Sequence, residues 1–204
     1  MASLAQDGSF ELIAGNPALD LVNTLDWRFR ENGSEELLNS YDDLLRFAAQ
    51  AEMIAPRQIK QILRSATHSA EAAALVDCRA LREAAADVFY AIVDGRTPSP
   101  SQLKCLDRMF KEARGLQHLA WSKPCLQWEW PASECDPYLP MWMLTIHTEK
   151  LLLSDDMKRL RACEKPDCRW LFLDTSKNHT RRWCDMKLCG NRMKARRFKA
   201  QHKA

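Results

Sequence analysis

The stretch RACEKPDCRWLFLDTSKNHTRRWCDMKLCGNR, residues 161–192, decides the fold at the end of this 204-residue chain. It holds four cysteines as two C-x4-C pairs, and fifteen residues separate the second cysteine from the third. Each close pair can supply two thiolates from one bend, and folding of the intervening segment can bring the pairs into a tetrahedron. The spacing therefore predicts a closed metal site formed by Cys163, Cys168, Cys184 and Cys189.

The ligand chemistry favours zinc. Soft thiolates suit zinc or an iron–sulfur centre. The segment has too few large apolar residues to fold without a cross-link or a bound metal. Zinc binding supplies about 10–16 kcal/mol of folding free energy. We therefore expect one Zn2+ per chain, in a closed shell that leaves no coordination position for a substrate. His179 lies between the pairs and is an alternative ligand, although the symmetric spacing favours the four cysteines.

The residues between the cysteines predict a hairpin over the metal. Trp170 to Leu173 are apolar, which predicts a strand, and the residues that follow them through Thr180 are polar. Cys184 and Cys189 are five residues apart, which is about 140° around a helix axis, so both cannot be regular helical ligands on one side. We expect Cys184 in the turn before the last helix and Cys189 at the start of that helix.

Positive charge accumulates behind the cysteines. Residues 155–204 contain 15 Lys/Arg and 6 Asp/Glu, whereas residues 1–154 contain 15 and 21. The segment from Asn191 to Lys203 lacks Gly and Pro and predicts a helix, with one basic face and with Met193 and Phe198 packing inward. Such unbalanced charge indicates a polyanion as partner.

Duplex DNA fits a basic helix on a zinc-stapled hairpin, with cations on phosphates and base readout by Asn191 and Arg192. The candidate DNA-binding residues are Arg181, Arg182, Asn191, Arg192, Lys194, Arg196, Arg197 and Lys199. RNA remains an alternative, because charge alone does not separate the two nucleic acids. A redox sensor that loses zinc on oxidation of its thiolates is a further alternative.

The upstream sequence predicts an α+β body that is mostly helical. A short strand is expected at 10–15, and helices are expected to begin near Pro17, Ser40, Pro56, Ser69, Ser99 and Tyr138. The stretch LQHLAWSKPCLQWEWP, residues 116–131, alternates around SKP and predicts a β-hairpin, with Trp121, Trp128, Trp130 and Trp142 as core around it. The break at 154–156 coincides with the charge reversal, so we place the domains at 1–154 and 155–204.

Two segments resemble known families. Residues 161–201 closely resemble the CGNR zinc finger, which is named for the motif seen here as Cys189-Gly190-Asn191-Arg192. The stretch LIAGNPALDLVNTLDWR, residues 12–28, resembles the opening of the ABATE domain, described as a putative stress-induced transcription regulator and usually found upstream of that finger. The resemblance implies a bacterial DNA-binding regulator and covers nearly the whole chain.

The body is expected to sense an effector or to dimerise. Asp20, Asn23 and Arg28 interleave with core positions and are candidate effector-binding residues, with a buried structural role as the alternative. One finger buries little surface, so a homodimer is expected. Phosphate-loop, nucleophile-elbow and H-E-x-x-H motifs are absent, which disfavours an enzyme. Neither an export signal nor a run of about 18 apolar residues occurs, so we expect a cytoplasmic protein without a membrane span.

Overall fold

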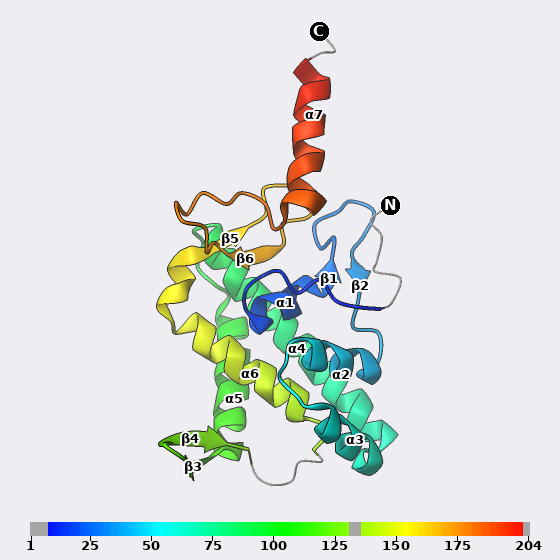
Figure 1. Cartoon of the computed structure of the whole chain (residues 1–204), viewed down its shortest axis with the longest axis vertical. Helices are drawn as coiled ribbons and strands as arrows, with labels where there is room; N and C mark the ends of the chain where they lie inside the picture. Colours follow the sequence, from blue (N-terminus) through cyan, green and yellow to red (C-terminus); the bar gives the residue numbers. More distant parts are fainter. Residues whose placement is uncertain (1–7, 131–135, 202–204) are drawn as a thin grey trace.

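The computed structural model describes residues 8–130 and 136–201, except the side chains of 196, 197 and 199–201. Its helices are α1 (Pro17–Asn23), α2 (Tyr41–Gln50), α3 (Pro56–Ser65), α4 (His68–Val93), α5 (Pro100–Leu116), α6 (Leu139–Leu152) and α7 (Asn191–Gln201), with short turns η1 (Asp155–Arg159) and η2 (Met186–Gly190). Three antiparallel pairs join β1 (Leu25–Asp26) to β2 (Glu35–Glu36), β3 (His118–Ser122) to β4 (Cys125–Glu129), and β5 (Leu160–Ala162) to β6 (Leu171–Leu173). A helical N-terminal region followed by a small cysteine-rich region confirms the α+β prediction (Figure 1).

Local sequence signals set where the helices begin. The Asn16 side chain accepts a hydrogen bond from Ala18 N, and Pro17 occupies the first turn of α1. Ser40 caps α2 in a reciprocal capping box with Asp43. The strand predicted at 10–15 is wrong, because these residues form no ladder. Ala14 instead accepts a single hydrogen bond from Leu173 N, 2.8 Å long, which places this segment beside β6.

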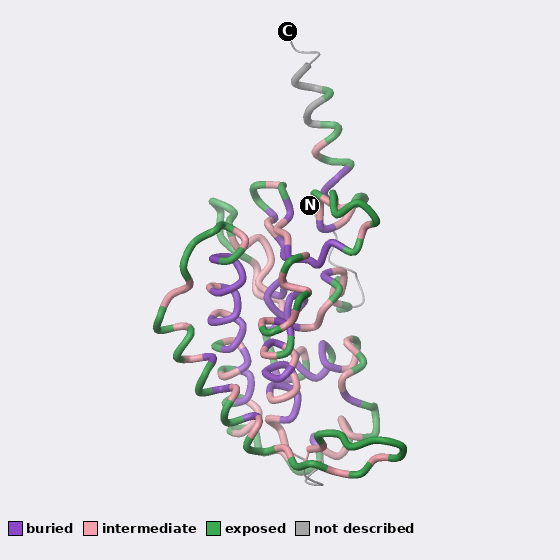
Figure 2. The backbone as a smooth tube through the Cα atoms, turned by 90° about the vertical axis from the view of Figure 1, so that its left-hand side faces the viewer, coloured by how far each residue is buried: buried purple, intermediate pink, exposed green. Residues whose placement is uncertain are grey.

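The body packs around α4, against which α1, α2, α5 and α6 lie (Figure 1). Its largest cluster of buried side chains includes Phe47, Leu81 and Leu144, from three different helices. Buried positions gather on the facing sides of the helices, as the purple tube segments of Figure 2 show. None of the helices in the described part of the chain combines the length and the apolar character needed to cross a bilayer.

The hairpin β3–β4 forms as predicted, but the prediction that its tryptophans are core is wrong. Trp121 is 62 % exposed and Trp128 is 56 % exposed. The register pairs Leu119 with Trp128 and Trp121 with Leu126, which places all four large side chains on one face. The alternation of side chains along the strands predicts this face, but it does not reveal what packs against it. No described element of this chain covers the face. Trp130 and Trp142 are partly buried against the core.

The C-terminal region shares a core with the body. A second cluster of buried residues unites Leu19 and Val22 of α1 and Phe89 of α4 with Phe172 of β6 and with all four cysteines of the tail. Residues before 155 and residues after it therefore both contribute apolar side chains to the cluster that contains the cysteines. Because neither part buries this surface without the other, we expect the two regions to unfold together.

A buried asparagine joins the two regions. Asn23, the last residue of α1, donates from Nδ2 to Leu171 O at 3.0 Å and accepts at Oδ1 from Leu171 N at 3.0 Å. Nearby, Trp170 Nε1 donates to Asp26 Oδ1 at 2.8 Å, and the Tyr90 hydroxyl donates to Arg169 O at 3.1 Å. One carboxamide thus satisfies both backbone groups of a β6 residue from 148 positions away in the chain.

Replacing Asn23 with Ala leaves a buried N–H and a buried C=O without partners. Each unsatisfied group costs about 1–3 kcal/mol, so we expect Asn23→Ala to lower the free energy of unfolding by about 2–6 kcal/mol in urea denaturation. Asn32→Ala, at an exposed loop position, serves as control and should change it by less than about 0.5 kcal/mol. Equal stability of the two variants would contradict this role of Asn23.

Candidate metal centre and nucleic-acid surface

The four predicted cysteines lie together. Their Sγ atoms are all within 4.8 Å of one another; Cys184 Sγ lies 3.7 Å from Cys168 Sγ and 3.6 Å from Cys189 Sγ. Sulfurs about 2.3 Å from a tetrahedral zinc ion are ~3.8 Å apart, so the spacing fits zinc. All four residues are buried, at 2–6 % exposure. His179 is not a member of the cluster, and its Nδ1 lies 3.2 Å from Asp174 O.

The four cysteine sulfurs lie on two bends of the chain, two on each. Cys163 directly follows β5 and Cys168 precedes β6, and Cys163 N donates to Trp170 O at 2.8 Å. The strand expected over 170–173 is β6, but it pairs with β5, Leu160 opposite Leu173, rather than with the polar segment that follows it. The hairpin therefore brackets the first cysteine pair.

The second bend is a tight turn that leads into α7. Cys184 precedes η2, as expected. Cys189 lies within this π-helical turn and is separated from α7 by Gly190, rather than at the start of the helix as expected. The Asp185 carboxylate caps the turn by accepting from Lys187 N and Leu188 N. Gly190 is buried here, and a Cβ atom on it would lie 3.1 Å from the ring of Trp183 and closer still to Met186. A glycine thus allows these side chains to close over the turn.

The crowded sulfurs cannot all carry a charge without an ion. Hydrogen bonds from the Cys168 and Cys184 thiols lower the pKa of Cys163, whereas its sulfur neighbours raise the pKa of Cys184. A divalent cation resolves this conflict, because it allows all four ligands to be thiolates at once. Donor type, spacing and burial all fit a zinc ion, which these four cysteines would hold in a closed, structural shell.

A buried aspartate and an arginine hold the loop between the cysteine pairs. Asp174 accepts from Ser176 N at 2.9 Å, from Ser176 Oγ at 2.6 Å and from Arg181 N at 2.9 Å. Burial of the Asp174 carboxylate opposes its charge, but these hydrogen bonds prevail and hold its pKa below the usual range. Arg181 donates to the carbonyl oxygens of Trp183 and Cys184, and its guanidinium lies 4.4 Å from the Phe172 ring centroid.

Arg182 also has a partner inside the chain. Its Nε donates to both Glu164 carboxylate oxygens at 2.7 Å, which ties the second cysteine bend to the first. Two of the cations predicted to contact DNA are therefore engaged in the fold around the cysteines. The sequence pattern missed Glu164 as the ion-pair partner of Arg182 and the carbonyl oxygens that hold Arg181, since a tally of charges over the tail does not reveal these contacts.

The other candidate DNA-binding residues lie on α7, which extends away from the body (Figures 1 and 2). Asn191, Arg192 and Lys194 are exposed; the side chains of Arg196, Arg197 and Lys199 lie outside the described residues. Phe198 is 62 % exposed, so the expectation that it packs inward is wrong. A groove of about 510 Å³ beside the start of the helix is lined by Ser176, Thr180, Arg181, Arg182, Trp183, Asp185, Met186 and Lys194.

The candidate effector residues are engaged within the chain. Asp20 is buried and accepts from Ala14 N at 2.9 Å, and burial raises the pKa of its carboxyl to about 6. Asn23 bonds Leu171 as described, and Arg28 forms an ion pair with Glu83 of α4. These contacts favour the structural alternative, and an effector role for the three residues stays a prediction.

Comparison with known proteins matches both regions. The model of the CGNR zinc finger family matches residues 159–202, which include all four cysteines. The model of the ABATE family, described as "putative stress-induced transcription regulator", matches residues 15–148. No curated protein matches the chain. The two matched spans follow one another at the end of α6, where the charge changes sign.

Removing one ligand should affect the whole chain, because the cysteines belong to a core shared with α1 and α4. For Cys189→Ser we expect zinc content to fall from about one per chain to near zero. The midpoint of a single thermal transition should fall by about 10 °C or more, because several kcal/mol of binding free energy are lost.

Metal analysis and calorimetry measure these two quantities. Cys125→Ser, at the exposed cysteine of β4, is the matched control and should change neither. Retained zinc in Cys189→Ser, or an unchanged body transition beside a separate early one, would contradict the assignment.

Proposed function

Since the chain belongs to the ABATE family and carries a CGNR zinc finger, we propose that it is a zinc-dependent, DNA-binding transcription regulator of the cytoplasm. The observation that carries the proposal is α7, an exposed helix whose base is fixed by the cysteine cluster. Eleven helical residues span about 16 Å, and a major groove about 12 Å wide accommodates such a helix.

The charge distribution supports α7 as the contact surface. Four thiolates around Zn2+ carry a net charge of about −2, and Arg181 and Arg182 lie beside them. Arg192 and Lys194, the α7 cations whose side chains are described, are exposed and have no comparable anionic cluster among the described residues. We assign base readout to Asn191 and Arg192, and phosphate contacts to Lys194, Arg196, Arg197 and Lys199. Arg181 and Arg182 line the groove beside Lys194, where a phosphate of the same duplex would be held.

The alternatives are weaker on specific grounds. Burial of the four sulfurs restricts access of oxidants, which favours a structural zinc ion over a redox sensor. The matched families are described as a regulator and a zinc finger, and a four-thiolate shell has no open position for substrate, so we infer no catalytic role for the metal. A competition titration of RNA against labelled duplex DNA tests the RNA alternative, and we expect the duplex DNA to be retained.

Salt dependence tests DNA binding. The logarithm of the affinity for duplex DNA should fall with the logarithm of salt concentration, with a slope of about −0.9 per phosphate neutralised. The double variant Arg192→Ala/Lys194→Ala removes one assigned phosphate contact and one base contact. It should therefore flatten the slope by about 0.9 and weaken binding at least tenfold at physiological salt. A fluorescence anisotropy titration at several salt concentrations measures both quantities.

Two charge-matched controls sharpen the salt experiment. Lys104→Ala removes an exposed cation from α5 and should leave the slope unchanged. Arg182→Ala removes one whose partner is Glu164 and should have a smaller effect than Arg192→Ala. A slope near zero for the intact chain, or equal effects of Lys104→Ala and Arg192→Ala, would overturn the proposal.

We further propose a homodimer formed through the β3–β4 hairpin. An isolated two-stranded hairpin is marginally stable in water, and this one exposes Leu119, Trp121, Leu126 and Trp128 on one face. A second copy offers the same face around a two-fold axis, as isologous interfaces require. The hairpin lies at the opposite end of the molecule from α7, so both α7 helices would stay free (Figure 1).

Changing two of these side chains should separate the subunits. Because both positions are exposed, Trp121→Ser/Trp128→Ser should keep the helical content measured by circular dichroism, while sedimentation velocity shows a shift from dimer to monomer at micromolar concentration. Val76→Ser changes an equally exposed residue of α4, 62 % accessible, and should leave the dimer intact. A monomeric wild-type chain would contradict this interface.

A further inference from the structure

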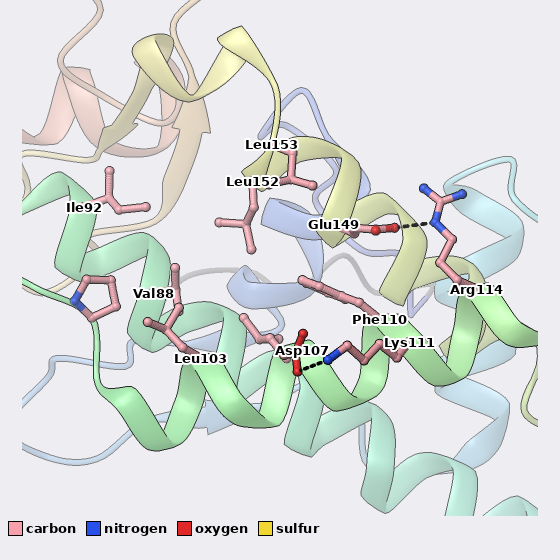
Figure 3. A pocket seen from close by; sticks show the side chains of 12 residues that line it. Val88, Ile92, Leu103, Asp107, Phe110, Lys111, Arg114, Glu149, Leu152 and Leu153 are labelled. Carbon is pink, nitrogen blue, oxygen red and sulfur yellow. Dashed lines mark hydrogen bonds and ion pairs between the residues drawn. The ribbon is translucent and has the colours of Figure 1, made fainter.

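A groove runs between α4, α5 and the end of α6, distant in sequence from the candidate effector residues (Figure 3). Its volume is about 630 Å³, within the range of roughly 300–1,000 Å³ typical of small-molecule sites. The walls are mostly apolar, and the side chains on them include Val88, Ile92, Leu103, Leu106, Phe110 and Leu152. Three of the lining residues, Ile92, Leu103 and Leu153, are 43 %, 45 % and 81 % exposed, so apolar surface faces the hollow.

One end of the groove carries two ion pairs (Figure 3). Lys111 Nζ lies 2.7 Å from Asp107 Oδ2 on α5, and Arg114 Nε lies 2.7 Å from Glu149 Oε2 on α6. Each cation is balanced by its own carboxylate, so this end has donors and acceptors but no net charge. A charged ligand would have to separate one pair, whereas an uncharged polar group can hydrogen-bond to both partners without doing so.

We propose that this groove is the effector site and that it binds an uncharged amphipathic molecule. An aliphatic or aromatic body would lie along Leu103, Leu106 and Phe110, and one hydroxyl, carbonyl or amide group would meet the ion pairs. Burial of such a body is favourable in proportion to the apolar surface that it removes from water. The regulatory part of this inference rests on the proposed function; the binding site itself does not.

The groove walls lead directly to the metal centre. Leu152 lines the groove and also packs against both core clusters, and its neighbour Leu151 is buried in the cluster that contains the four cysteines. On the opposite wall, Ile92 lies two residues before Asp94, whose Oδ1 is 2.6 Å from Arg169 Nη2 between the cysteine pairs. A bound molecule would therefore touch the ends of both helices against which the finger packs.

Three probes with one chain length and different charges test the ligand class. Octan-1-ol, octanoate and octylammonium present the same apolar body, so differences among them report the head group. With the full-length protein and no DNA, saturation-transfer NMR and calorimetry should give octan-1-ol at least a fivefold lower Kd than either ion. Absence of binding by all three, or equal Kd values for the alcohol and an ion, would overturn the proposed class.

A filling substitution tests the location. Leu103→Trp adds an indole on the groove wall at a 45 % exposed position and should raise the Kd for octan-1-ol at least tenfold without lowering the thermal midpoint. Leu63→Trp makes the same change on α3 at 46 % exposure, outside the groove, and should leave that Kd unchanged. Equal losses in both variants would overturn the location.

A final measurement separates the site from the function. Saturating octan-1-ol should change the Kd for duplex DNA at least threefold in the wild type and leave it unchanged in Leu103→Trp. A chain that binds octan-1-ol in the groove while its DNA affinity does not respond would overturn the effector role. A chain that binds octan-1-ol but no DNA would overturn the proposed function and leave the binding site supported.

Discussion

The reciprocal hydrogen bonding of Asn23 with Leu171 is the constraint on which the rest of the structure depends. Both backbone groups of Leu171 are buried, so water cannot replace the carboxamide that satisfies them. This contact sets α1 against β6, and Trp170 and Arg169 then meet Asp26 and Tyr90 beside it. The metal centre is formed next to this contact, and the two family regions share one core as a result.

The cations of the C-terminal region fall into two groups with different structural roles. Arg181 and Arg182 hold the loops that carry the cysteines, through main-chain carbonyls and through Glu164. Arg192 and Lys194 lie on a helix exposed to solvent. Positive charge near thiolates stabilises the centre itself, so net charge alone overstates what is available to a partner. Nucleic-acid contacts are thus best assigned by position in the fold.

Features with short-range causes could be predicted from the sequence. The spacing of four cysteines identified the cluster, Ser40 identified the start of α2, and the alternation around SKP identified β3–β4. What failed depends on distant partners. Residues 10–15 have strand-like composition but find only one hydrogen bond at β6, and β6 pairs with β5 rather than with the residues after it. A single sequence carries no signal for the Asn23 contact or for the bare face of the hairpin.

The length of the turn η2 determines the direction in which α7 presents its cations, and so affects how the binding preference of the helix could change. The described side chains of α7 are not buried against the body. The direction of the helix is therefore set by the preceding turn, the five residues that end at Gly190. Each residue of an α-helix advances the azimuth by about 100°. One residue inserted between Gly190 and Asn191, after the last cysteine, would therefore rotate every cation of α7 together by about 100°, while the sulfurs and the body stayed in place.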